Sequence, residues 1–166
     1  MFHDVKLTRG NAIEINYILD TTNFDHPMGN RFRYAVTKNV EATGKEIEEV
    51  KIAFPAPEGL VEYTNKRRDI YKKHSIKDEK AYKEMSVDAK KVLDGEVKQL
   101  ETDNKALIDE VKALEEEKSK FLEEEITLKL YKLHIDSWPT ISQNNKYPAW
   151  DIWDVLLKHV ITEPDD

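Results

Sequence analysis

A seven-residue repeat runs through residues 90–125 and limits the folds open to this chain. Leucines recur every seven positions up to Leu114, Phe121 continues their row, and a second row made mostly of valine lies between them. This 3-4 spacing is that of a coiled coil with Leu at d and Val at a, and it predicts a long helix that packs on another helix. The seam residues are Leu93, Val97, Leu100, Asn104, Leu107, Val111 and Leu114.

The charged residues beside the seam indicate which helix packs against this one. A parallel homodimer would set Glu96 against Glu101 and Glu110 against Glu115, and like charges repel. The segment 31–73 is a better partner if it runs out and 80–125 runs back. Basic residues then lie beside acidic ones, for example Arg31 near Glu123–Glu125. We therefore expect an antiparallel hairpin within one chain, with a homodimeric zipper and a zipper to a foreign helix as alternatives.

The segment 31–54 has the same periodicity as the seam. Val36, Val40, Thr43, Ile47, Val50 and Phe54 alternate in steps of four and three. Pro55 and Pro57 interrupt this helix, and a third helix is expected over 58–74, followed by a polar connection over 75–84. Thr8 and Ser86 are predicted helix caps, because a hydroxyl there accepts from an early backbone N–H.

The period changes to two after Glu125, which predicts a strand over 126–136 that pairs with residues 2–7. Pro148 suits the start of a final helix. The predicted fold is mainly α and a single domain, 1–166. It consists of a long antiparallel helical hairpin, a coiled-coil stalk formed by 31–125, on a small base formed by 1–30 and 126–166. The base holds a two-stranded β-sheet and short N- and C-terminal helices.

Composition excludes several classes of function. With 39% hydrophobic and 36% charged residues, the chain suits an elongated helical shape better than a compact sphere. The sequence has no cysteine, and it contains no apolar run long enough to cross a membrane. No histidine pair has helical ligand spacing, no glycines form a phosphate loop, and no serine sits in a nucleophile elbow. We expect no catalytic residue, no metal and no cofactor.

Positive charge is concentrated in one stretch of an acidic chain. The net charge is −7, yet Lys and Arg outnumber Asp and Glu by two to one in residues 66–91. Such residues around a tyrosine suit phosphate contact and stacking, although they also suit solvation of a helix end. We call the candidate partner-binding residues the basic cluster and expect them at the tip of the stalk. They are Lys66, Arg67, Arg68, Tyr71, Lys72 and Lys73.

Three further features have alternative interpretations. Asn104 either pairs across the seam, with Thr43 as its partner, or lies exposed at a gap in it. His134 and Asp136 share a strand face, which suits an acid–base or metal pair but more simply a solvated surface. Trp138, Trp150 and Trp153 form part of the core of the base or, if exposed together, a binding patch.

Several segments resemble a family of small phage proteins of the domain-of-unknown-function kind. They are LTRGNAIEINYIL, RFRYAVTKNVEATGKEIEEV, GLVEYTNKRRDIYKKHSIKDE and FLEEEITLKLYKLHIDSWP. The resemblance covers most of the chain and implies phage or prophage origin. It transfers no catalytic residue, because these segments contain no chemical motif. The chain departs from the family in its three tryptophans near the C-terminus and its long loop over 137–147.

These observations predict a non-enzymatic phage accessory protein. It would bind a protein or nucleoprotein of the host, for example a defence nuclease, and block or redirect it. Nucleic-acid phosphate contact is expected at the basic cluster, membrane contact is not, and the chain would be a monomer or small homo-oligomer in the host cytoplasm. The alternative is a virion or tail-assembly component, and an enzyme or small-ligand sponge is a third hypothesis.

Overall fold

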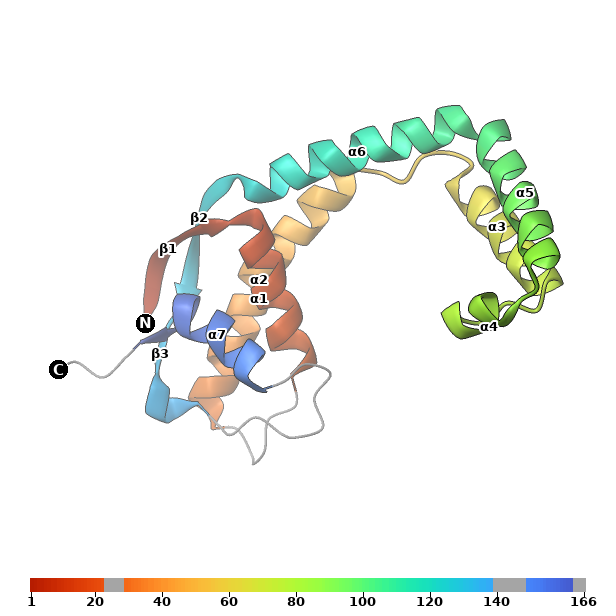
Figure 1. The fold of residues 1–166 in the computed structure, drawn as a ribbon. Helices are drawn as coiled ribbons and strands as arrows, with labels where there is room; N and C mark the ends of the chain where they lie inside the picture. The colour runs from red at the N-terminus through yellow and green to blue at the C-terminus, as the bar shows by residue number, and fades with distance from the viewer. Residues whose placement is uncertain (23–28, 139–148, 163–166) are drawn as a thin grey trace. The chain divides into compact units, whose positions relative to one another are not determined.

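The computed structural model describes residues 1–22, 29–138 and 149–162, with the side chains of 135, 149–153 and 162 left out. Within this part of the chain the fold is mainly α, as predicted, with seven α-helices and a two-stranded antiparallel sheet (Figure 1). The chain divides into two compact units. Unit 1 is Met1–Ala53 with Lys118–Asp166, and unit 2 is Phe54–Glu117.

The sheet of unit 1 pairs β1 (Phe2–Thr8) with β2 (Glu125–Tyr131). The strands are antiparallel, with Phe2 opposite Tyr131 and Thr8 opposite Glu125. This confirms the predicted pairing of the N-terminus with the segment after the glutamates. Burial alternates along both strands, because successive side chains point to opposite faces.

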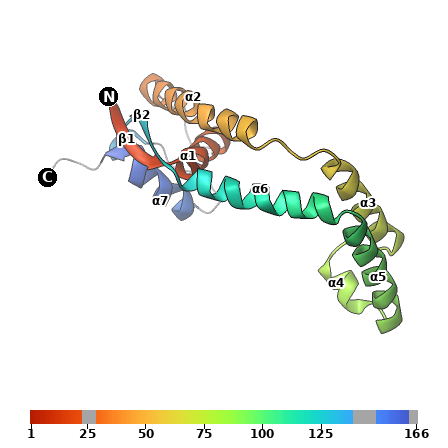
Figure 2. The ribbon, with the colours of Figure 1, turned by 90° about the horizontal axis from the view of Figure 1, so that it is seen from above.

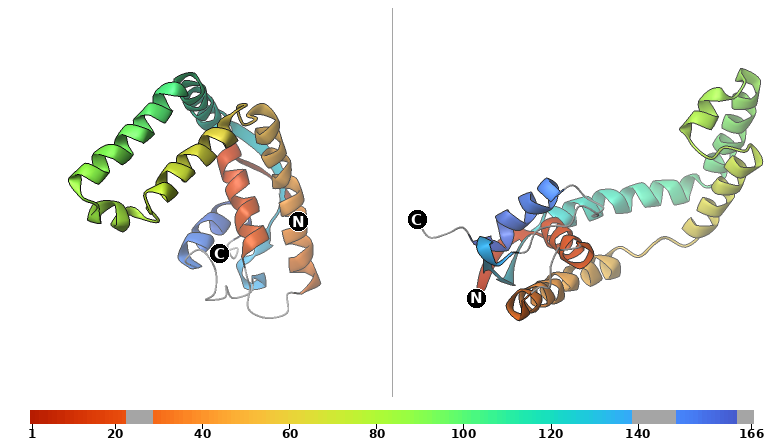
Figure 3. Two further views of the ribbon diagram at one scale, coloured as in Figure 1. Left: turned by 90° about the vertical axis from the view of Figure 1, so that its right-hand side faces the viewer. Right: turned by 90° about the horizontal axis from the view of Figure 1, so that it is seen from below.

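Helices cover one face of this sheet. The hydroxyl of Thr8 accepts from the backbone N–H of Asn11 at 3.1 Å and begins α1 (Arg9–Thr21), as predicted. Helix α1 packs beside α2 (Asn30–Ala53) and α7 (Ala149–His159), and the views in Figures 2 and 3 agree on its pairing with α2. The buried core is Val5, Leu7, Ala12, Ile15, Ile18, Leu19, Leu130, Leu156, Val160 and Ile161.

Two short strands after the sheet return the chain to this core. β3 (Leu133–His134) pairs in parallel with β4 (Ile161–Thr162). A short 3-10 helix, Ile135–Ser137, follows β3. Trp138 packs against the core, and its ring meets Phe32 edge to face at 5.0 Å between centroids. The predicted roles of Trp150 and Trp153 lie outside the described side chains.

Helix α2 differs from its prediction in the face that it buries. The fully buried residues are Phe32, Ala35, Asn39, Thr43, Glu46 and Val50, so polar side chains occupy half of the buried positions. Because α2 packs on α1 and β2, residues 31–53 belong with the base and not with the stalk. The expected boundaries at 31 and 125 therefore move to 54 and 117.

Unit 2 contains an antiparallel helical pair. Helices α3 (Leu60–Lys73) and α5 (Val87–Asp103) lie side by side, and the short α4 (Glu79–Glu84) stands between them in sequence. Lys73 contacts Glu96, whereas Gly59, just before α3, lies beside Leu107. The register of the predicted hairpin would instead have placed Lys73 opposite Tyr82. The difference arises because the connection after α3 folds into a helix of its own.

The predicted long return helix is interrupted at Asn104. Helix α5 ends there and α6 (Lys105–Glu123) begins, and Asn104 has φ −113° and ψ 24°. Its side-chain amide donates to the carbonyl of Leu100 at 2.8 Å, so it competes with the backbone for that acceptor. The expected Thr43 partner was wrong, since the Thr43 hydroxyl bonds to Asn16 and to the carbonyl of Asn39.

Candidate functional site

All six residues of the basic cluster lie on α3, in unit 2. Three of its lysines pair with carboxylates. The Nζ of Lys66 lies 2.7 Å from Glu62, that of Lys72 lies 4.0 Å from Asp69, and that of Lys73 lies 2.7 Å from Glu96. Lys72 and Lys73 also stand in the last turn of α3, where cations stabilise the helix dipole. Structural roles therefore account for these three lysines.

The two arginines of the cluster have a different environment. Arg68 donates to the side-chain oxygen of Asn65 at 2.9 Å, and the guanidinium carbon of Arg67 lies 5.9 Å from the centroid of the Tyr71 ring. The pKa of Arg67 is raised, first by a hydrogen bond to the Tyr71 side chain and also by the nearby charge of Glu101. Neither arginine has an ion pair among the described residues.

The chain reverses sharply after α3 and turns back onto Tyr71. The N–H of Ile76 donates to the carbonyl of Tyr71, and that of Ser75 to the carbonyl of Lys72, both at 2.9 Å. These two bonds form a Schellman motif, in which the residue at Ser75 has to be left-handed. Ser75 has φ 58°, which is unusual for a residue other than glycine. The motif brings residues 76–78 back beside the last turns of α3.

This reversal and α3 line an open hollow of about 390 Å³. We call it the Tyr71 hollow. Three cations line it together with one carboxylate, one aromatic ring and one aliphatic side chain. Its lining residues are Thr64, Arg67, Arg68, Tyr71, Ile76, Lys77 and Asp78. Sequence analysis found Arg67, Arg68 and Tyr71 but missed Ile76, Lys77 and Asp78, because only the Schellman motif places them against α3.

Beyond the residues that line the hollow, α4 is joined to α5 by side-chain contacts. Asp78 caps α4 by accepting from the N–H of Ala81 at 2.8 Å. The hydroxyl of Tyr82 lies 3.1 Å and 3.2 Å from the two carboxylate oxygens of Asp94, and this hydrogen bond raises the pKa of Tyr82. The ammonium of Lys90 lies 5.5 Å from the centre of the Tyr82 ring. Tyr82 thus fixes α4 to α5.

A compact ion cluster joins the end of α3 to α5. Both Lys73 and His74 approach Glu96, and the Nε2 of His74 lies 3.3 Å from a Glu96 oxygen. The pKa of Glu96 is lowered, chiefly by its hydrogen bond to Lys73 and further by His74, against the opposing effect of desolvation. This cluster was not predicted, because it depends on the observed register of the two helices.

The seam residues face partly inward. Leu93 is buried, and Val97, Leu100, Asn104, Leu107, Val111 and Leu114 are half-buried, whereas their neighbours at the outer positions are exposed. The heptad row therefore identified the less exposed face of α5 and α6. Apolar surface remains outside it, as Val87 and Val92 are 68% and 54% exposed.

Arg9 is the main charged contact that sequence analysis missed. Its guanidinium pairs with Glu46 and Glu49 at 2.5 Å and with Glu124 at 3.4 Å, and it lies 4.3 Å from the centre of the Phe121 ring. Arg31 was expected near Glu123–Glu125, but Glu124 pairs with Arg9, so that prediction was wrong. Because Arg9 joins α1, α2 and the end of α6 within unit 1, we interpret it as a structural contact.

The pair of His134 and Asp136 lies at the protein surface. The Nδ1 of His134 lies 3.2 Å from Asp136 and accepts the backbone N–H of that residue, and the Asp136 side chain is 85% exposed. Among the described residues, no group of His, Asp and Glu converges on a metal-binding arrangement. Within the same part of the chain, no helix has both the length and the apolar character required to span a bilayer.

Within the part of the chain that the structure describes, the Tyr71 hollow brings an aromatic side chain together with both arginines of the basic cluster, neither of which has a carboxylate ion pair there. Comparison of the chain with protein-family models, with curated proteins and with solved structures finds no match.

Proposed function

We propose that this chain is a non-enzymatic phage accessory protein that binds a host macromolecule, a protein or nucleoprotein such as a defence nuclease, and blocks or redirects it. The observation that supports this proposal best is the separation of charges on α3. Lys66, Lys72 and Lys73 have carboxylate partners, whereas Arg67 and Arg68 line a hollow with Lys77. Arg68 uses one N–H on Asn65 and Arg67 bonds to Tyr71, but a guanidinium has five N–H donors, so donors remain for a ligand.

The contact would be selective for negative charge. Arginine presents a planar fork of N–H donors that matches carboxylate and phosphate oxygens. Three cations around one hollow attract an anionic surface, while the net charge of −7 repels nonspecific anionic partners from the rest of the chain. This distribution favours a localised contact over binding by the whole surface. The protein would act in the host cytoplasm.

A matched pair of charge reversals tests the proposal. In the hollow variant, Arg67, Arg68 and Lys77 become Glu, and in the control variant Lys66, Lys72 and Lys80 become Glu, so both change the net charge equally. Each tagged full-length protein is used to capture partners from host lysate, and its melting temperature is measured. We expect the hollow variant to lose the partner that the original chain and the control retain. Capture of no partner by the original chain, or equal capture by both variants, would contradict the proposal.

A second candidate function is a virion or tail-assembly component. It is favoured by the half-buried seam of α5 and α6 and by the exposed Val87 and Val92, since symmetric association would cover such apolar surface. Mass spectrometry of purified phage particles distinguishes the two functions. Stoichiometric presence in the particle supports the structural role, and absence from it supports the accessory role.

A further inference from the structure

We propose that the Tyr71 hollow binds a nucleotide unit, with the phosphate held by Arg67, Arg68 and Lys77 and the base packed against Tyr71. This inference rests on the proposed function and names the chemistry that the site recognises. The hollow has a volume of about 390 Å³ and is open to solvent, so a bound nucleotide would lie on its surface.

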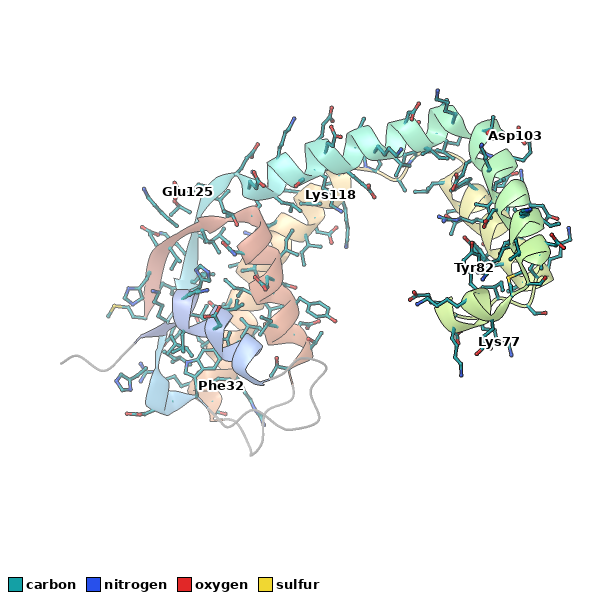
Figure 4. All side chains as sticks on the ribbon, viewed as in Figure 1. Phe32, Lys77, Tyr82, Asp103, Lys118 and Glu125 are labelled. Carbon is teal, nitrogen blue, oxygen red and sulfur yellow. The ribbon has the colours of Figure 1, made fainter. Side chains whose placement is uncertain are left out.

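The phosphate position follows from the cations. Arg67 and Arg68 are adjacent on α3, and Lys77, which is labelled in Figure 4, follows that helix and lines the same hollow. Two guanidinium forks and one ammonium group supply both the geometry and the charge that a phosphate group requires. The helix dipole does not explain the arginines, because both lie before the last turn of α3.

The base position follows from the planar and aliphatic groups. Tyr71 is half-buried, so part of its side chain remains exposed to the hollow, and Arg67 lies over its ring. Aromatic rings and arginine planes are the surfaces on which unstacked bases pack. Ile76 lines the same hollow and adds apolar contact. A phosphate ion alone would make no use of these walls.

Asp78 favours a nucleotide over an acidic peptide segment. It is the one carboxylate among the lining residues, and one of its oxygens accepts the N–H of Ala81. A carboxylate on the wall repels a ligand that carries only carboxylates. By contrast, the amino group of a base or a sugar hydroxyl can donate to it while the phosphate meets the cations.

Binding of labelled oligonucleotides to the full chain tests this proposal. The probe is a fluorescent single strand of about ten nucleotides, and its anisotropy is measured over protein concentration and salt. If three phosphate contacts form, affinity should fall about 20-fold between about 50 and about 200 mM salt. Unlabelled nucleoside monophosphates serve as competitors. Displacement of the probe by nucleoside monophosphates indicates a site for free nucleotides. Displacement by unlabelled oligonucleotides alone indicates a site for the strand. Either result supports nucleotide recognition.

Matched variants identify the residues. Replacement of Arg67, Arg68 and Lys77 by Ala should weaken binding at least tenfold, whereas the same change at Lys66, Lys72 and Lys80 should weaken it about threefold or less, because those lysines already have carboxylate partners. Tyr71→Leu should reduce affinity about fivefold or more through lost stacking. Circular dichroism of each variant verifies that the helices are retained.

Three results would overturn the proposal. They are no binding by the original chain at low salt, equal loss in the two triple variants, and displacement of the probe by polyglutamate with no effect of Tyr71→Leu. The last result would assign the hollow to an acidic protein surface. Failure here remains distinguishable from failure of the proposed function, since the hollow variant could still lose a captured host partner that contains no nucleic acid.

Discussion

Asn39 shows how one side chain can complete the hydrogen bonding of a strand. It is buried to 1% exposure on α2, donates to the carbonyl of Tyr131 at 3.1 Å and accepts from the N–H of the same residue at 2.6 Å. The amide therefore occupies the place of a neighbouring strand at the end of β2. Sequence periodicity cannot reveal this role, because it counts apolar positions and assigns asparagine to the surface.

Replacing Asn39 by Leu should leave both backbone groups of Tyr131 without these partners. We expect the free energy of unfolding to fall by about 2–3 kcal/mol, the cost of buried polar groups that lose their hydrogen bonds. Urea denaturation measures it. Asn65→Leu, at an exposed position of α3, is the control and should change stability by about 0.5 kcal/mol or less. Similar effects for the two variants would contradict the role of Asn39.

At Ser75, by contrast, a substitution should increase the stability of the fold. Glycine adopts a φ of 58° without steric strain, whereas a residue with a Cβ atom is strained there. Ser75→Gly should therefore stabilise unit 2 by about 1 kcal/mol. Ser86 has φ −63° and caps α5, so the same substitution there should destabilise by a few tenths of a kcal/mol. Urea midpoints of the two variants provide the comparison. A loss of stability in Ser75→Gly would show that the serine side chain is required.

Glu96 makes the stability of unit 2 dependent on pH. Its pKa in the folded chain is lowered from 4.5, first by Lys73, so ionised Glu96 stabilises the fold above that pH. This stabilisation is lost as the pH falls below 4.5 through the folded pKa. Glu96→Gln should therefore reduce stability at neutral pH and remove part of the decline in acid. Thermal melts from below pH 4.5 to neutral pH check this prediction, with Glu116→Gln, at an exposed position of α6, as the control.

At the scale of elements, the sequence predicts the helices well and their pairing poorly. Capping residues, prolines and apolar spacing are local signals, and they placed the caps at Thr8 and Ser86 and the strand after Glu125. Partner and register depend on contacts between distant segments. The apolar spacing over 31–54 predicts a stalk helix, but the face that α2 buries also contains Asn39 and Glu46, which the apolar pattern does not count. For the same reason, the sequence did not predict that Ile76, Lys77 and Asp78 line the Tyr71 hollow.

The break at Asn104 is a property of the α5–α6 element and gives its own prediction. Asn104→Leu removes the side-chain amide that competes for the Leu100 carbonyl and places an apolar residue in the a row between Val97 and Val111. We expect greater helix content by far-ultraviolet circular dichroism and a higher urea midpoint. Polar residues at a positions also specify oligomeric state, so sedimentation should show more self-association. Unchanged helix content would show that the surrounding fold, and not the amide, imposes the break.

At the scale of the whole molecule, the division into two compact units predicts that a core mutation in one unit destabilises that unit and not the other. Leu93 is 1% exposed and belongs to unit 2, whereas Ile15 is fully buried in the core of unit 1. Replacing either residue by Ala should reduce the free energy of unfolding by about 2–5 kcal/mol. In hydrogen exchange of the full chain, Leu93→Ala should accelerate exchange in α3 and α5 while β1, β2 and α1 stay protected, and Ile15→Ala should do the reverse. Loss of protection throughout the chain in both variants would show that the two units unfold as one.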